Sequence, residues 1–448
     1  MLNIIIFNDV SIPFFCKIDT EPKLISMRNF VLIALIAFFS GILHGQNRVV
    51  PEKIRQLERS GATFANFELF SKNTNSVTNL KYQQSASDVT VLYLDYTALA
   101  QINNDAPPFI SVLIPYGEDV LSVKMYKENA LSDQFEAYDN NGNSIDYKPG
   151  KYYRGIVDGD YTSLVAISFF DNNIIGVIST NRFGNIVIGK STDKQDYISY
   201  SDRNLLGVNP FKCATEDLKL KIEDYIKDEP EKLRRTRSTT NCARIYYEIG
   251  NEIYLQFSSN MQDVLDWITG VQNNIGTLYD NDDIRVNLNE VKVWVTADPY
   301  TGSYSDNLYL FRDLTPTFDG DIAHLVKYPA TTSVAFLNSL CSEYRYAYSG
   351  ISLSYAQVPV YSWTIMAMSH EMGHGFGSPH THACAWNGNN TAIDGCGPTA
   401  GYDEGCNAPL PSNGGTIMSY CHLVSGVGIN FNNGFGPQPA ALIQNTID

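Results

Sequence analysis

Eleven consecutive residues, 370–380, constrain this chain more than any other part of its sequence. Their order is HEMGHGFGSPH. On a helix, residues four apart lie on one face, so His370 and His374 can present their imidazole rings to one ion. Gly377 can adopt the left-handed conformation that ends a helix, which lets the chain turn back and bring His380 to the same ion. The spacing therefore predicts a metal site of three histidines on a helix and the turn after it.

The number of histidines indicates which metal the site holds. Three imidazoles leave the fourth position of a tetrahedral zinc ion open for water, as a catalytic zinc requires. Zinc lowers the pKa of that water towards about 7 and polarises a carbonyl group. Glu371 is turned away from the two helical histidines, yet it can reach the water and shuttle its proton. We therefore expect one catalytic Zn²⁺ on His370, His374 and His380, with Glu371 as the general base.

A second motif supports the zinc assignment. Residues 416–420, Thr-Ile-Met-Ser-Tyr, form the methionine turn that accompanies this long histidine signature. Five of the seven histidines of the chain lie between 370 and 422. A surface helix followed by an ordinary strand would not bring the two motifs together. His382 and His422 do not have the required spacing, so we expect them to be loop residues rather than ligands.

An apolar run near the N-terminus has the length of a signal peptide rather than of a membrane span. Ten consecutive apolar residues occupy positions 30–39, whereas a span needs about 20. Arg28 precedes the run, and Gly45 follows it as a small residue suited to cleavage. We therefore assign residues 27–45 as a signal peptide and interpret residues 1–26 as an over-extended start.

The signal peptide predicts that the chain is secreted and extracellular. After its removal the chain would begin near Gln46 and would not insert into a membrane. Disulfides persist outside the cytoplasm, and the sequence has eight cysteines. Cys16 lies ahead of the signal and is lost with it. Six cysteines follow residue 237 and can close as three disulfides, in pairings that the sequence does not select: Cys242, Cys341, Cys384, Cys396, Cys406 and Cys421. Cys213 is left over.

The mature chain divides into three regions. Residues 46–215 contain short runs rich in Val, Ile, Leu and aromatic residues, separated by turn clusters, and are predicted to be β-rich. Residues 216–237 alternate acidic and basic side chains without an apolar face and end in a basic stretch, which indicates an exposed linker that proteases can cut. In residues 238–448, predicted strands alternate with helices. This pattern predicts an α+β domain in which one mixed, twisted sheet is covered by helices.

The charge distribution excludes one class of partner. The formal net charge is −16, and from Ser238 onward six basic residues stand against nineteen acidic ones. Lys and Arg are absent after Arg345, so the basic surface needed for nucleic-acid binding is missing. The Asp- and Asn-rich clusters at 139–142 and 280–283 are expected to be turns, which leaves a structural Ca²⁺ without support.

The chain resembles the metzincin zinc metalloproteases through its histidine motif and methionine turn. Within that clan it is most similar to the reprolysin (adamalysin) family. Residues 152–178 resemble the reprolysin propeptide, and residues 333–352 resemble the strand region ahead of the zinc helix. Two positions depart from the family. Thr381 stands where reprolysins usually have Asp, and Tyr420 is more like the tyrosine of astacins and serralysins.

The resemblance implies a metzincin-like catalytic domain, residues 238–448, made as a zymogen behind the propeptide. It implies endopeptidase activity on protein or peptide substrates. Met418 would lie beneath the zinc as an apolar floor, and Tyr420 would ligate zinc or stabilise the transition state. Residues 333–339 would be the edge strand to which a substrate adds as an antiparallel strand. Residues 384–420 would form one wall of the side-chain pocket.

The leftover Cys213 is explained by the same resemblance. A thiolate is a good fourth zinc ligand, and similar metalloproteases use a propeptide cysteine to displace the catalytic water. We expect Cys213 to cap the zinc until cleavage near Arg237. The alternative is a buried or exposed cysteine with no such role, since residues 210–215 do not closely match the reprolysin switch motif.

Two other functions remain open at this level. A zinc-bearing adhesion or binding module would keep the three histidines without cleaving its partner, although Glu371 argues against it because inactive relatives commonly lose this residue. A zinc hydrolase acting on non-peptide substrates would keep the ligands but would need no edge strand.

Overall fold

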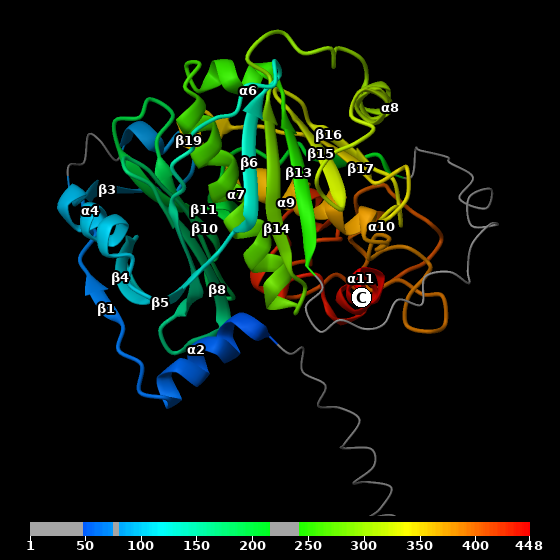
Figure 1. Cartoon of the computed structure of the whole chain (residues 1–448). Coiled ribbons are helices and arrows are strands. Elements are labelled where there is room, and N and C mark those ends of the chain that lie inside the picture. Colours follow the sequence, from blue (N-terminus) through cyan, green and yellow to red (C-terminus); the bar gives the residue numbers. More distant parts are fainter. Residues whose placement is uncertain (1–47, 75–79, 216–241) are drawn as a thin grey trace, which may run out of the picture. The chain divides into compact units, whose positions relative to one another are not determined.

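The computed structural model describes residues 48–74, 80–215 and 242–448 (Figure 1). The expected over-extended start, signal peptide and charged linker lie outside the described residues. The described part contains two large β-sheets with helices packed against them. This arrangement confirms the expected α+β class.

The first sheet is formed by residues ahead of the linker. Its strand order is β1-β4-β5-β7-β8-β9-β10-β11-β3-β2, and all neighbours are antiparallel except β1 and β4. Strand β9 is buried along its whole length. The sheet corresponds to the β-rich region that the sequence predicts. Its strands are β1 (Ala65–Phe67), β2 (Phe70–Lys72), β3 (Thr90–Leu94), β4 (Phe109–Tyr116), β5 (Asp119–Glu128), β7 (Lys151–Val157), β8 (Asp160–Phe169), β9 (Ile174–Thr180), β10 (Gly184–Lys190) and β11 (Tyr197–Ser201).

The second sheet is mixed and has the order β12-β16-β17-β15-β13-β14-β6. Only β16 and β17 pair antiparallel; the other neighbours are parallel. A separate short hairpin consists of β18 (Ser354–Tyr355) and β19 (Val358–Pro359). The strands of the mixed sheet are β6 (Leu131–Asp139), β12 (Lys212–Cys213), β13 (Ala243–Ile249), β14 (Val286–Val293), β15 (Ile322–Lys327), β16 (Thr332–Ala335) and β17 (Tyr346–Gly350).

Both edge strands of the mixed sheet, β6 and β12, come from the region ahead of the linker. Sequence reasoning did not anticipate this exchange, because it treated residues 46–215 as self-contained. In strand β6 only Leu131 and Ala137 are buried, and the other residues, most of them polar, are partly or fully exposed, the pattern of an ordinary surface strand. Such a pattern does not indicate which sheet a strand joins, since pairing partners far apart in sequence leave no local signal.

The long helix α7 (Met261–Asn281) packs against both sheets. It contacts β7, β8 and β9 of the first sheet and β14 of the second, and Figure 1 shows it between them. The side chain of Asn260 caps the first turn of α7, because it accepts a hydrogen bond from the backbone N–H of Asp263. The other helices are α2 (Val49–Arg59), α4 (Tyr96–Asp105), α6 (Asn251–Gln256), α8 (Tyr304–Leu314), α9 (Tyr361–Gly375), α10 (Cys396–Thr399) and α11 (Pro437–Ile447).

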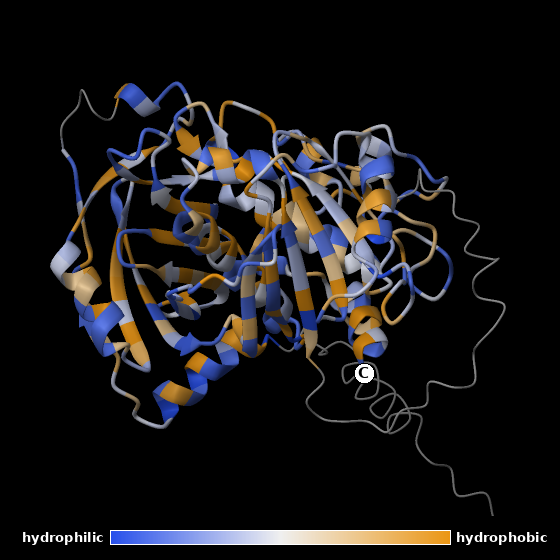
Figure 2. Cartoon of the chain, turned by 45° about the horizontal axis from the view of Figure 1, so that its top comes forward, coloured by the Kyte–Doolittle hydropathy of each residue, from blue (hydrophilic) through white to orange (hydrophobic). Residues whose placement is uncertain are grey.

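Hydrophobic residues concentrate on the strands of both sheets, whereas α2 carries apolar and polar residues on opposite sides (Figure 2). Val50 and Ile54 form the buried side of α2. The largest apolar core joins the two regions, because it contains Val177 of the first sheet together with Ile268 of α7 and Met372 of α9. In the described ranges, no helix has both the length and the apolar character to cross a bilayer.

One carboxyl group at the junction of the two regions should make stability depend on pH. Asp266 on α7 is buried beside Tyr147, and burial is the main cause that raises its pKa to about 7. A carboxyl whose pKa is raised by folding favours the folded state at low pH. That contribution is lost as the pH rises from the ordinary value of 3.8 towards 7.

We therefore expect Asp266→Asn to stabilise the full chain more at pH 8 than at pH 5, by a difference of roughly 1–4 kcal/mol. Thermal or denaturant unfolding of wild type and variant at both pH values measures it. Asp313→Asn is the control, because the Asp313 side chain is 60% exposed. An Asp266→Asn effect of equal size at both pH values would contradict the assignment.

Candidate metal centre

The three histidines of the motif converge on one point. His370 and His374 lie on α9, and His380 follows the end of this helix. Their Nε2 atoms are 3.2 Å apart for His370 and His374, 3.0 Å for His374 and His380, and 3.1 Å for His370 and His380. Nitrogen ligands of one tetrahedral zinc, each at about 2.0–2.1 Å, lie about 3.3 Å from one another. The three atoms are therefore spaced as ligands of a single ion.

Backbone carbonyl groups fix the orientation of the two helical rings. Nδ1 of His370 lies 2.7 Å from the carbonyl oxygen of Ile417, and Nδ1 of His374 lies 2.7 Å from that of Ser378. A carbonyl can only accept, so each Nδ1 carries the proton and each Nε2 presents a lone pair. Burial is the main cause that lowers the pKa of His370, which keeps its ring neutral. Neutral imidazole is the form that binds metal.

The turn after α9 is built as its sequence predicts. Gly377 has φ +97°, a conformation that residues with a Cβ rarely adopt, and its N–H donates to the carbonyl of His374. The chain then reverses so that His380 faces the helix. Trp386 supports this position by donating its indole N–H to the carbonyl of His380 at 2.7 Å.

Glu371 points into the same buried region. One oxygen, Oε2, lies 3.3 Å from the hydroxyl of Thr215, which donates to it, and 3.9 Å from Sγ of Cys213. The other oxygen, Oε1, has no hydrogen-bond partner among the described residues. Burial raises the pKa of Glu371 well above its usual value. A carboxyl with a raised pKa and a free oxygen is suited to proton transfer.

Cys213 completes a set of four ligand atoms. Its Sγ lies 3.4 Å from Nε2 of His374, and it groups with the three histidines within 4.8 Å. Lys212 and Cys213 pair in parallel with Thr332 and Ser333 of β16, so β12 extends the sheet at the entrance of the site. Three imidazole nitrogens and one thiol sulfur form a donor set that suits tetrahedral zinc. The residues present therefore fit this ion.

The methionine turn lies directly against the zinc helix. Met418 is fully buried, and a Cβ added at Gly373 would lie 2.5 Å from its Sδ, which shows how closely the sulfur approaches α9. The ring of Tyr420 packs edge-on against His380, with centroids 4.6 Å apart. Its hydroxyl donates to the carbonyl oxygen of Cys213 at 3.2 Å.

Two residues that flank β12, Phe211 and Thr215, contact the site, and the sequence did not indicate either of them. Phe211 is buried against the rings of His370 and His422, with centroids 5.3 and 5.2 Å away, and Thr215 donates to Glu371. His422 lies in a short 3-10 helix, where its Nε2 is 3.1 Å from the carbonyl oxygen of Phe211. These contacts join residues that are 156 to 211 positions apart in the sequence, so no local pattern could have revealed them.

Two expectations remain, one about His382 and one about a structural Ca²⁺. His382 lies in the turn after the histidine motif, as expected of a loop residue, but it is buried there. Its ring stacks on His380 with centroids 4.9 Å apart, and its Nε2 lies 3.6 Å from Oε1 of Glu404. The Asp139 side chain accepts from the backbone N–H groups of Asn141 and Asn143, as in a turn. Calcium remains unsupported.

The cysteine expectation needs a correction. Two disulfides form, Cys384–Cys406 and Cys396–Cys421, and both brace the segment between the histidine motif and the methionine turn. Cys242 and Cys341 do not pair in the described part of the chain, so the expected third disulfide is absent there. Cys242 immediately precedes strand β13 and is partly buried, whereas Cys341 is exposed in a turn. The even count of six did not guarantee three bridges, because pairing depends on proximity in the fold.

Comparison with known proteins agrees with this geometry. Residues 238–427 match the reprolysin-type family described as metallo-peptidase family M12. The human disintegrin and metalloproteinase domain-containing protein 19 is 24% identical over an alignment of 253 residues, and the match covers 52% of this chain and 26% of that protein. The chain thus matches about a quarter of the length of this relative. Metalloproteinase-II from Bacteroides fragilis aligns over 63% of this chain and 84% of its own, with 12% identity and a TM-score of 0.36.

Residues 238–427 are therefore a metzincin domain, defined by the long histidine motif on α9 and the methionine turn beneath it. Within the metzincins this domain is of the reprolysin type, in metallo-peptidase family M12.

The contact between Met418 and Gly373 leads to a prediction about the floor of the site. Met418→Leu should retain zinc and cost less than about 1.5 kcal/mol, because the swap nearly conserves volume and the sulfur is not a ligand. Gly373→Ala should be worse, because its methyl group would meet the Met418 sulfur at 2.5 Å. Chemical unfolding and zinc content of the two variants measure both effects. Loss of zinc in Met418→Leu would contradict this role.

Proposed function

We propose that the chain is the zymogen of a secreted zinc-dependent metalloendopeptidase that hydrolyses peptide bonds of extracellular proteins. The observation that carries the proposal is the triangle of three Nε2 atoms, 3.0–3.2 Å apart, beside the Glu371 carboxyl. The proposed division is an over-extended start (1–26), a signal peptide (27–45), a propeptide (46–215), a linker with the activation site (216–237) and the catalytic domain (238–448).

The proposed chemistry assigns one role to each side chain. His370, His374 and His380 would hold the zinc, which when bound polarises the scissile carbonyl and lowers the pKa of a nearby water. Glu371 would take a proton from the attacking water and pass it to the leaving amine. The Tyr420 hydroxyl already donates to a carbonyl oxygen at this point, that of Cys213. After removal of the propeptide it could donate in the same way to the substrate's oxyanion.

Strand β16 supports an endopeptidase rather than a hydrolase of small molecules. Its Thr332 and Ser333 already pair with an extended segment, Lys212–Cys213. A substrate strand would use the same backbone groups after this segment leaves, in the antiparallel direction expected from the resemblance. Backbone pairing accepts any extended chain, so a side-chain pocket beside the zinc would set the cleavage preference. Residues 384–420 would contribute one wall of it.

Three contacts from the proposed propeptide support latency at the same site. The Cys213 sulfur lies among the zinc-binding nitrogens, Thr215 donates to Glu371, and Phe211 covers the ring of His370. Thiolate ligation would occupy the fourth zinc position and exclude the attacking water. The proposed propeptide would therefore block the metal, the base and the substrate strand together.

Zinc binding and catalysis should separate in two variants. His374→Ala removes a ligand and should lose both zinc and activity. Glu371→Ala should keep one zinc per chain but lose at least about 10²–10⁴-fold in turnover, because the proton carrier is missing. Gelatin or casein zymography of activated protein, together with metal analysis, measures both. Equal zymogram activity in wild type and Glu371→Ala would overturn the catalytic assignment, and an inactive wild type that holds zinc would favour a binding module.

The role of Cys213 is tested before the linker is cut. If the thiolate caps the zinc, uncleaved Cys213→Ser should show activity that the uncleaved wild type lacks, since serine is a poorer zinc ligand. A peptidase assay on the two uncut proteins measures this difference. Thr192→Ser, in the same region but away from the zinc ligands, serves as the control. Equal latency in Cys213→Ser and wild type would show that coverage of the cleft inhibits without the thiol.

A further inference from the structure

The region ahead of the linker contributes the strand at each edge of the mixed sheet. At one edge, β6 pairs with β14 in parallel, from Leu131 opposite Leu288 to Asp139 opposite Val293. At the other edge, β12 pairs with β16 beside the metal site. The core strands of this sheet all come from residues after the linker. Cutting the linker would therefore leave a catalytic sheet whose two outer strands belong to the other fragment.

Side chains reinforce the edge formed by β6. Ser132 donates its hydroxyl to the Asn289 side chain at 2.6 Å. Just beyond the strand, Asn140 accepts the backbone N–H of Val295 at 2.9 Å and donates to the Thr296 hydroxyl at 3.0 Å. The backbone pairs and these side chains satisfy polar groups of β14 that would otherwise face solvent. This edge thus binds the preceding region independently of Cys213.

A third contact area lies along one side of α7, where the residues are small or polar. We call these residues the α7 stripe, and they recur at helical spacing: Asp266, Thr269, Gly270, Asn273, Gly276 and Asp280. The hydroxyl groups of Tyr147 and Thr269 lie 2.8 Å apart. A Cβ at Gly270 would lie 3.0 Å from Ile175 of β9, so the first sheet approaches the helix backbone closely here.

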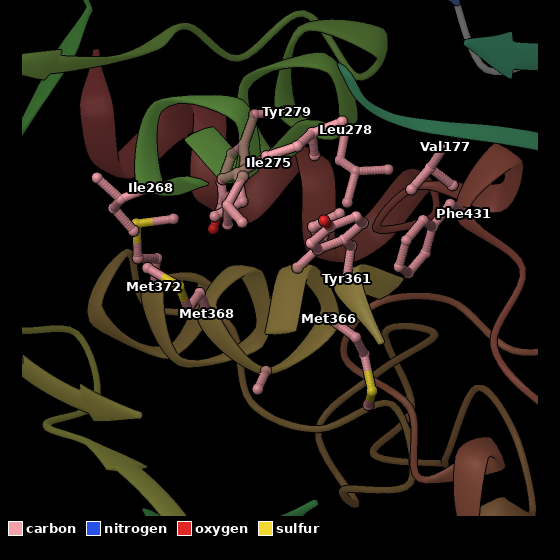
Figure 3. Close-up of a cluster of buried hydrophobic side chains, with 14 of the residues drawn as sticks. Val177, Ile268, Ile275, Leu278, Tyr279, Tyr361, Met366, Met368, Met372 and Phe431 are labelled. Carbon is pink, nitrogen blue, oxygen red and sulfur yellow. The ribbon is translucent and has the colours of Figure 1, made fainter. Parts of the chain in front are cut away.

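The opposite side of α7 is apolar and belongs to the catalytic domain. Figure 3 shows Ile268, Ile275 and Tyr279 of α7 between this helix and Met368 and Met372 of α9. Helix α7 therefore has one apolar side and one side, the α7 stripe, of small and polar residues, and both sides are buried.

Arg154 of β7 is the most specific contact of the α7 stripe. Its side chain is only 5% exposed. Its Nε donates to Oδ1 of Asn273 at 3.3 Å, and its Nη1 donates to Oδ2 of Asp280 at 3.4 Å. A Cβ at Gly276 would lie 2.6 Å from Nη2, so this glycine makes room for the guanidinium. A buried, paired charge of this kind is costly to disrupt from one side.

We infer that cutting the linker does not release the propeptide. The fragment 48–215 remains bound to the catalytic domain through β6, β12 and the α7 stripe, and Arg154 positions it there. The inference rests on the proposed zymogen arrangement, but it does not require Cys213 to ligate zinc. It places the control of activity in the later dissociation or destruction of the bound propeptide.

The experiment uses the full chain with residues 232–237 replaced by the recognition sequence of a site-specific protease. A Glu371→Ala background prevents self-digestion. After complete cutting, size-exclusion chromatography over a dilution series should show both fragments in one peak at the mass of the uncut protein. In the same background, Arg154→Ala should weaken association at least about 30-fold, because it leaves Asp280 without its buried partner. Arg182→Ala is the matched control, since Arg182 pairs with Asp119 at the surface and is 70% exposed.

Separate elution of the wild-type fragments at micromolar concentration would overturn the inference. Co-elution of the cut Arg154→Ala fragments with wild-type affinity would overturn the role of Arg154. The uncut Arg154→Ala protein must unfold cooperatively, and Asn273→Ala replaces it if it does not. Elution does not depend on catalysis, so a failed zymogram would count against the proposed function alone. In the catalytically intact chain, cutting should leave activity low until the propeptide is removed.

Discussion

The structure depends on the burial of three imidazole rings and one carboxyl group at a single point. Buried polar groups are unfavourable unless they are hydrogen-bonded, and converging nitrogen lone pairs repel one another. The carbonyls of Ile417 and Ser378 take the two Nδ1 protons, so the methionine turn and the end of α9 are held to the same rings. This requirement explains why α9 is buried throughout and why two disulfides brace the loops around it.

Both edges of the mixed sheet are covered by strands from the region ahead of the linker. An open edge strand offers unpaired backbone groups to any extended chain, which a peptidase needs and a stored precursor must prevent. Strand β12 covers the edge beside the zinc site and carries Cys213 to the histidines with the same two residues. Strand β6 covers the opposite edge of the sheet, where it pairs with β14. In the proposed zymogen, β12 would both block the site and attach the preceding region, whereas β6 attaches this region at the other edge of the sheet.

Helix α7 connects these elements because it contacts both sheets. Its apolar side continues the core beneath α9, and its polar stripe meets the first sheet. Arg154 and Asp266 are two side chains of this contact whose charged forms are disfavoured by burial. The guanidinium is compensated by Asn273 and Asp280, whereas burial raises the pKa of the Asp266 carboxyl. The contact between the two regions thus places charged groups beside the apolar core that joins them.

The sequence by itself determined the features that depend on local spacing. Residues four apart share a helix face and Gly377 permits a sharp reversal, so His370, His374 and His380 could be assigned before any fold was known. The β-rich character of the first region was likewise readable from its short apolar runs. Only the tertiary structure decided that β6 and β12 join the second sheet, that Thr215 and Phe211 reach the site, and that two disulfides form rather than three. These features depend on contacts between segments far apart in the chain. Such contacts are selected by packing and backbone pairing across the whole fold, and they leave no periodic trace in the residues that make them.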